Sequence, residues 1–163
     1  MSEFFAHIFA GVEQARTWRE EQRAAGRRVV FTNGCFDVLH AGHVMYLAWA
    51  RKHGDALIVG LNGDESVRAL KGAPRPINPY EDRAHVLAGL RSVDGVVRFD
   101  ELTPERLIEA LKPDAIVKSA QYREEDLPEA EIVRAYGGEV LLAPHLDGHS
   151  TSEILRRGAE RTS

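Results

Sequence analysis

The 163-residue sequence lacks several features that would place it in a specialised class of protein. Its single cysteine, Cys35, excludes an intrachain disulfide and a multi-cysteine zinc site, and it is typical of a reducing compartment. No apolar run approaches the roughly 18 residues of a membrane span. The first ten residues carry Glu3 and His7, where a secretion leader would be basic. We therefore expect a cytoplasmic protein that does not bind a membrane.

Basic residues are also scarce. There are 21 lysines and arginines against 25 acidic residues, which gives a net charge of −4, and no basic run is dense. Nucleic acid is therefore not the expected partner, and an anionic ligand would need local positive charge. The apolar fraction of 44% and the charged fraction of 28% are ordinary for one globular domain. No linker or internal repeat divides the chain, so we expect a single domain over residues 1–163.

Short β-rich runs alternate with helical stretches over residues 28–157. The expected strands are 28–32, 56–62, 95–99, 115–118 and 139–143, and the expected helices are 42–53, 64–70, 80–92, 103–111, 129–136 and 150–157. The run from Ala56 to Gly60 is continuously apolar, as in a parallel sheet that helices cover on both faces. The pattern predicts an α/β fold: a three-layer α/β/α, Rossmann-like domain with a five-stranded parallel sheet.

The first 26 residues read as one amphipathic helix that ends at Gly26. The apolar face would be formed by Phe5, Ile8, Phe9 and Val12, and the solvent face by Glu13, Arg16, Arg19, Glu20 and Glu21. Such a helix would either cover the core of its own domain or form the contact of a homodimer. The sequence leaves both alternatives open.

The stretch from Lys71 to Pro79 holds three prolines and is expected to be a loop. In an open parallel sheet, ligands bind beyond the carboxyl ends of the strands. This loop and those after Thr32 and Lys118 should therefore converge on one crevice.

The segment from Thr32 to His43 leads from the first expected strand into a helix and carries the clearest chemistry. Gly34 lets the backbone pass close to a ligand, and Gly42 leaves room beside the helix start. The free amides of a first helical turn attract anions. His40 and His43 are three residues apart, so both would face the same phosphate site.

Separately, each of these features has an ordinary explanation, because a glycine turn is common and two histidines can cap a helix or bind zinc. No third ligand stands at a spacing typical of zinc, so we predict no metal held by protein ligands alone. The conjunction of strand, glycine turn, aromatic residue and His-x-Gly-His is far rarer than any of its parts.

The run Gly-Cys-Phe-Asp-Val-Leu-His-Ala-Gly-His resembles the signature of the cytidylyltransferase-like nucleotidyltransferases. Further stretches resemble, in order, the adenylyltransferase half of the bacterial bifunctional heptose kinase/heptose 1-phosphate adenylyltransferase: Asn62-Gly63-Asp64-Glu65-Ser66-Val67, Lys71-Gly72, Arg75-Pro76-Ile77-Asn78, Glu81-x-Arg83-x-x-x-Leu87 and Asp147-Gly148-His149-Ser150-Thr151-Ser152. The resemblance covers about residues 29–155.

This resemblance implies transfer of AMP from ATP to a phosphorylated acceptor of the sugar 1-phosphate type, with pyrophosphate released. The acceptor phosphate is already anionic, so catalysis needs alignment and charge stabilisation and no protein nucleophile. The implied catalytic residues are His40, His43, Lys71 and Arg83. The implied nucleotide-binding residues are Thr32, Asn33, Gly34, Cys35, Phe36, Gly42, His43, Asn62, Asp64, Lys118, Tyr122, Ser150 and Thr151. Mg²⁺ is expected mainly on the triphosphate.

Two residues of the signature are expected to act differently. Asp37 is interpreted as a structural group that hydrogen-bonds turn amides, and Cys35 as a small neighbour of the site without thiolate chemistry.

The sequence departs from the resembled pattern at one place. Where heptose-type enzymes carry Lys-Gly-Gly-Asp-Tyr, this chain has Lys118-Ser119-Ala120-Gln121-Tyr122. The loss of two glycines and an acid leaves the nucleotide base and the acceptor open. One alternative is CTP-dependent transfer to glycerol 3-phosphate or another small phosphorylated alcohol. Another is a nucleotide-binding scaffold without turnover.

Overall fold

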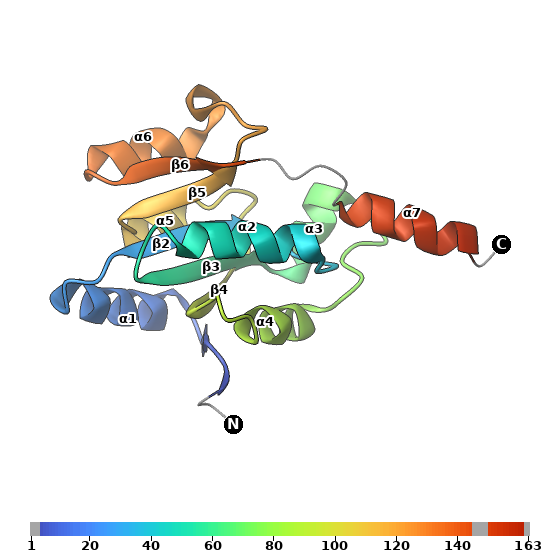
Figure 1. Cartoon of the computed structure of the whole chain (residues 1–163), viewed down its shortest axis with the longest axis horizontal. Helices are drawn as coiled ribbons and strands as arrows, with labels where there is room; N and C mark the ends of the chain where they lie inside the picture. The colour runs from blue at the N-terminus through green and yellow to red at the C-terminus, as the bar shows by residue number, and fades with distance from the viewer. Residues whose placement is uncertain (1–3, 145–149, 162–163) are drawn as a thin grey trace.

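The computed structural model describes residues 4–144 and 150–161, and within them six parallel strands form one sheet in the order β1-β4-β3-β2-β5-β6 (Figure 1). The strands are β1 (His7–Phe9), β2 (Val29–Gly34), β3 (Ala56–Asn62), β4 (Gly95–Phe99), β5 (Ala115–Ser119) and β6 (Glu139–Ala143). The helices are α1 (Val12–Ala24), α2 (Ala41–Arg51), α3 (Asp64–Lys71), α4 (Tyr80–Ala88), α5 (Glu105–Leu111), α6 (Pro128–Ala135) and α7 (Thr151–Arg161), with a 3₁₀ turn, η2, at Glu124–Asp126.

Helices cover both faces of the sheet, which confirms the three-layer α/β/α architecture. On one face, Leu47 of α2 and Leu87 of α4 pack in a buried cluster with the strand residues Leu57 and Val117. On the other face, α1, α5 and α6 supply the buried residues Ala15, Leu107, Ile108, Leu111 and Val133. Every residue of β3 is buried, as its continuous apolar run predicts.

The sheet has a sixth strand that the sequence reading missed. Residues 7–9 were expected inside the first helix, yet His7–Phe9 form β1 and pair in parallel with β4, with Ile8 opposite Val96. Phe9 is buried, and a side chain at Gly95 would overlap its ring, since a Cβ there would lie 2.6 Å from Phe9 Cε2. A run of three residues is too short for its periodicity to distinguish a strand from a helix. The strand forms because it pairs with β4, which lies more than eighty residues away in the sequence.

The helix itself begins at Val12, and the chain leaves it through Gly26, whose φ of +70° fits the predicted stop. Arg19 was assigned to the solvent face of this helix, and that assignment is wrong. Its side chain is fully buried and pairs with Asp114 at 3.0 Å, while Nη2 donates to the Lys112 carbonyl. A long aliphatic stem lets an arginine cross an apolar surface to reach such a partner.

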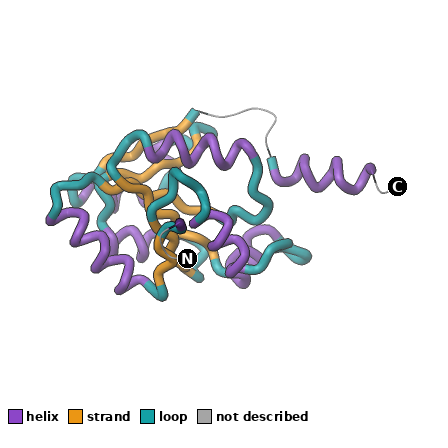
Figure 2. The backbone as a smooth tube through the Cα atoms, turned by 60° about the horizontal axis from the view of Figure 1, so that its bottom comes forward, coloured by secondary structure: helices purple, strands orange, loops and turns teal. Residues whose placement is uncertain are grey.

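The chain order places a topological switch point between β2 and β5, because β3 and β4 follow β2 on one side and β5 lies on the other. Unlike the α-helices from α1 to α6, α7 projects away from the body and has no buried residue (Figure 2). Within the described chain, every helix is too short or too polar to traverse a bilayer.

Candidate active site

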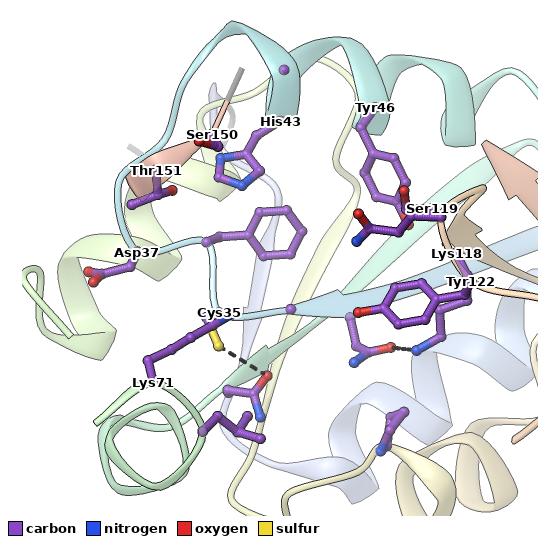
Figure 3. A pocket seen from close by; sticks show the side chains of 18 of the residues that line it. Cys35, Asp37, His43, Tyr46, Lys71, Lys118, Ser119, Tyr122, Ser150 and Thr151 are labelled. Carbon is purple, nitrogen blue, oxygen red and sulfur yellow. Dashed lines mark hydrogen bonds between the residues drawn. The ribbon is translucent and has the colours of Figure 1, made fainter. Parts of the chain in front are cut away.

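A cavity of about 750 Å³ opens beyond the carboxyl ends of β2, β3 and β5, at the switch point (Figure 3). The starts of α2, α6 and α7 and the end of α3 form further parts of its walls. Its lining includes most of the predicted site residues: Asn33, Gly34, Cys35, Phe36, His40, Gly42, His43, Asn62, Lys71, Lys118, Tyr122, Ser150 and Thr151. Three predicted residues do not line it, namely Thr32, Asp64 and Arg83.

The two histidines stand together at the start of α2. The centroids of the His40 and His43 rings lie 3.8 Å apart, and Phe36 meets His43 edge-on at 5.2 Å. Burial, together with the nearby His40, lowers the pKa of His43 to about 4, so its ring is neutral at pH 7. Within the described structure, the buried Nδ1 of His43 has no hydrogen-bond partner. The two rings lie beside the free amides of the first turn of α2. Because this turn contains no acidic residue, the site favours an anion.

Gly34 is required by the aromatic residue two positions later. A Cβ at Gly34 would lie 2.9 Å from the ring of Phe36, and Phe36 itself has a φ of +43°. The ring thus folds back over the end of β2 and supports His43. This turn delivers the histidines to the cavity.

The predicted loop after α3 is anchored by Asp37, whose side chain is fully buried. Its carboxylate accepts hydrogen bonds from the amides of Ile77 and Asn78 and from Nε of Arg75. Burial alone would raise the pKa of Asp37, but these amide hydrogen bonds and the Arg75 guanidinium outweigh it and lower the pKa. The structural role expected for Asp37 is what the geometry shows. The anchored loop holds Arg75 against the cavity, and α3 ends there with Lys71.

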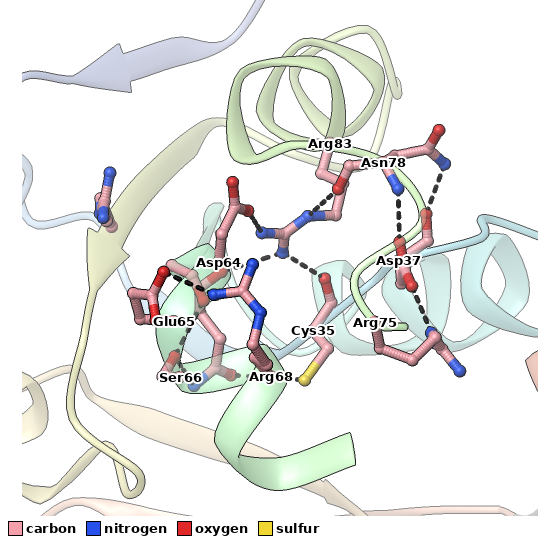
Figure 4. Close-up of polar contacts among 12 residues, drawn as sticks. Cys35, Asp37, Asp64, Glu65, Ser66, Arg68, Arg75, Asn78 and Arg83 are labelled. Carbon is pink, nitrogen blue, oxygen red and sulfur yellow. Dashed lines mark hydrogen bonds and ion pairs between the residues drawn. The ribbon is translucent and has the colours of Figure 1, made fainter. Parts of the chain in front are cut away.

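Arg83 does not line the cavity, and its guanidinium is enclosed by backbone carbonyls and the Asp64 carboxylate (Figure 4). Nη1 donates to the carbonyls of Cys35 and Asn62, Nε donates to Asn78, and Nη2 pairs with Asp64 at 2.6 Å. Its side chain is only 1% exposed. The contact between Arg83 and phosphate stays a prediction. The geometry instead makes Arg83 a link between the ends of β2 and β3, the start of α3 and the anchored loop.

Of two other residues placed at the site by resemblance, Thr32 serves the framework and Cys35 lines the cavity. Thr32 is fully buried, and its hydroxyl bonds to the Val117 carbonyl and to the Tyr46 hydroxyl. Burial raises the pKa of Tyr46 to about 12. Cys35 does line the cavity, and burial raises the pKa of its thiol, so it stays protonated as expected.

The wall at the end of β5 is built around Lys118. Its ammonium donates to Asn33 Oδ1 at 2.8 Å and forms an ion pair with Glu129 of α6. Tyr122 and Ser119 lie on the same side of the cavity (Figure 3). No role was predicted for Glu129 or for Arg75, although Arg75 begins the Arg-Pro-Ile-Asn motif. The partners Lys118 and Asp37 are 11 and 38 residues away, so no local pattern announced these pairs.

The last predicted motif is described only from Ser150 onward, since residues 147–149 lie outside the described residues. Ser150 accepts a hydrogen bond from the Glu153 amide and caps α7. Thr151 donates to the Val38 carbonyl at 3.4 Å. Both residues line the cavity opposite Cys35 and Lys71 (Figure 3).

The donor set does not form a metal cage of its own. Among residues 4–144 and 150–161, no three histidine, cysteine or acidic side chains gather as metal ligands. Of the acids at the cavity, Asp37 is committed to amides and Arg75, Glu129 pairs with Lys118, and Asp126 forms a long ion pair of 3.9 Å with Arg123. This composition fits a magnesium ion carried by phosphate oxygens and water.

Comparison with known proteins agrees with this geometry. The sequence profile of the cytidylyltransferase-like family matches residues 31–157. Proteins called "Bifunctional protein HldE" are similar over most of the chain: the one from Alcanivorax borkumensis is 53% identical over 87% of it, and the one from Pseudomonas paraeruginosa is 54% identical over 90%. These matches cover 30% and 31% of the relatives, so the chain spans about a third of their length.

Two solved structures share the fold. A lipopolysaccharide core biosynthesis protein from Thermoplasma volcanium superposes with a TM-score of 0.59 at 27% identity, covering 74% of this chain and 98% of its own. A pantoate-beta-alanine ligase from Francisella tularensis superposes with a TM-score of 0.60 at 12% identity, covering 90% and 69% of the two chains. The second likeness concerns the fold alone.

Proposed function

Because this chain belongs to the cytidylyltransferase-like family, we propose that it transfers AMP from ATP to a sugar 1-phosphate of the heptose type and releases pyrophosphate. The observation that carries the proposal is the stacked pair of His40 and His43 at the start of α2, in one cavity with Lys71. The relatives are named as bifunctional and the chain matches about a third of their length, which suits one of two activities. The motif resemblance selects the adenylyltransferase half.

In the proposed reaction, an oxygen of the acceptor phosphate forms a bond to the α-phosphorus of ATP. The bond from that phosphorus to the bridging oxygen breaks, and pyrophosphate leaves. His40, His43 and the first-turn amides of α2 bind and orient the triphosphate, and Lys71 meets the charge that develops on the departing oxygens. When bound, magnesium neutralises phosphate charge and aligns the leaving group. Ser150 and Thr151, which line the same cavity, bind the outer phosphates.

The test measures pyrophosphate release with each nucleoside triphosphate against a panel of sugar 1-phosphates and small alcohol phosphates, with magnesium present. We expect turnover with ATP and a heptose-type 1-phosphate. Activity only with CTP and an acceptor such as glycerol 3-phosphate would replace the proposal. Binding of ATP and magnesium without transfer to any acceptor would identify a scaffold.

Other expectations accompany this function. A cytoplasmic location, a homodimer and the absence of a nucleic-acid partner stay predictions. Ile8 of the edge strand β1 is exposed, and so is Phe4, which precedes this strand; both support a contact between copies there. Measurement of the mass of the whole chain in solution tests the dimer.

A further inference from the structure

Glu129 is a buried acid in the wall of the cavity, and the proposed transfer reaction leaves it without a role. Glu129 is only 3% exposed, yet it lines the cavity together with Pro128 and Asp126. An acidic side chain is rarely buried to this degree unless a partner or a ligand compensates it. The position of Glu129 therefore calls for a chemical explanation.

Two features hold the side chain of Glu129 in place. Lys118 pairs with its Oε1, and the pair is enclosed, with side-chain exposures of 14% for Lys118 and 4% for Glu129. Glu129 also lies in the first turn of α6, directly after Pro128, where the helix dipole favours negative charge. The hydrogen bond from Lys118 to Asn33 fixes the ammonium from the other side. The carboxylate thus keeps a defined orientation.

This carboxylate has acceptor capacity beyond its ion pair. A carboxylate offers two oxygens with about four lone-pair sites, and the contact with Lys118 uses Oε1. The group that meets it in the cavity must donate hydrogen bonds. A phosphate is unsuitable because it would bring like charges together, whereas a hydroxyl is a neutral donor.

The two ends of the cavity differ accordingly. His43 and Lys71 lie on one side of the cavity and Lys118, the partner of Glu129, lies on the other (Figure 3). The first side is suited to phosphate, and the second is suited to hydroxyl groups. The resembled motif carries an acid at position 121, where this chain has Gln121. Glu129 supplies a carboxylate to the same wall from α6.

We propose that Glu129 is a specificity-determining residue that accepts hydrogen bonds from hydroxyl groups on the sugar of a bound substrate. This inference rests on the proposed function, in which two ligands carry such hydroxyls: the ribose of ATP and the sugar 1-phosphate. The shared chemistry is a polyol held at the Lys118 side of the cavity.

The first arm of the test concerns the ribose and needs no turnover. Calorimetry compares a non-transferable ATP analogue with its 2′-deoxy and 3′-deoxy forms, on the wild type and on Glu129→Gln, with magnesium present. If ribose is the polyol, the variant binds the parent analogue about tenfold to a hundredfold more weakly and binds one deoxy form unchanged.

The second arm concerns the acceptor. The kcat/KM values of the best sugar 1-phosphate and its monodeoxy forms are measured on the same two proteins. If the acceptor is the polyol, the kcat/KM of the variant falls by the same factor, chiefly because the KM for the acceptor rises. One monodeoxy form then reacts equally well with both proteins.

Glu131→Gln is the matched control, because Glu131 lies in the same first turn of α6 but is exposed. It should leave all ligands unaffected. Glu129→Ala, checked by its melting temperature, replaces the Gln variant if that protein does not fold.

Equal losses for ligands with and without each hydroxyl, in both arms, would overturn the inference and leave Glu129 as a partner of Lys118 only. So would a wild type that distinguishes none of the deoxy forms. A protein that transfers no AMP but shows the ribose effect would refute the proposed function and keep this inference.

Discussion

Two polar clusters, one around Arg83 and one around His43, use their hydrogen-bonding groups in opposite ways. Around Arg83, the guanidinium is committed to three carbonyls and one carboxylate, and the side chain is almost fully enclosed (Figure 4). Around His43, a buried ring nitrogen lacks a partner within the described structure, and the ring faces a cavity. Committed donors mark the framework, whereas uncommitted donors in a cavity mark the place for a ligand.

The comparison also separates residues that a motif treats alike. Both Arg83 and His43 were predicted to contact phosphate, but only His43 lines the cavity. The cluster around Arg83 should therefore govern stability, and the cluster around His43 should govern turnover.

The largest effect is expected from Arg83→Met. The substitution leaves the buried carbonyls of Cys35 and Asn62 without donors and Asp64 without its ion pair, so the free energy of unfolding should fall by about 3–5 kcal/mol. Urea unfolding measures the change. The matched control is Arg91→Met, because Arg91 is exposed. A loss no larger than that of the control would remove the framework role.

The next effect tests the other cluster. His43→Ala should lower kcat by about two to three orders of magnitude, the effect of losing one donor to developing charge, while the unfolding midpoint changes little. Pyrophosphate release and urea unfolding are the two measurements. His85→Ala serves as control, since His85 is exposed on α4. A decrease of less than about tenfold would contradict the transition-state role.

The smallest effect concerns pH. The pKa of His43 is lowered to about 4, so between that value and its ordinary 6.5 the unfolded chain binds more protons. Stability should fall as the pH decreases through this window. Between about pH 6.5 and pH 4.5, the wild type should lose about 2 kcal/mol more than His43→Gln.

Urea unfolding at the two pH values measures this difference. The pKa of Asp37 is lowered below its ordinary 3.8, so its own contribution to stability is lost only at more acidic pH. Equal pH dependence in wild type and variant would mean that His43 is not a buried neutral ring.

Much of the fold followed from local patterns. The bounds predicted for the strands at 56–62, 95–99 and 139–143 match β3, β4 and β6. The strand β1 did not follow, because its three residues are held by pairing with β4 and not by their own propensity. Arg19 was misplaced for a similar reason, since Asp114 lies far along the chain.

The candidate site shows the same division. The turn from Asn33 to His43 could be predicted from the sequence, because one short segment contains both the backbone turn and the side chains that line the cavity. The hydrogen bonds from Arg83 to the carbonyls of Cys35 and Asn62 could not be predicted. These residues are 48 and 21 positions away, and a sequence motif does not state which atoms an arginine contacts. The pairing of Glu129 with Lys118 likewise depends on the fold.

The anchoring of the loop by Asp37 has a kinetic consequence. Residues Arg75, Ile77 and Asn78 are bound to one carboxylate before any substrate arrives. Nucleotide association then need not wait for this loop to become ordered, and little conformational entropy is lost there on binding. The observed rate of association should increase in proportion to nucleotide concentration, without the plateau that a slow rearrangement imposes.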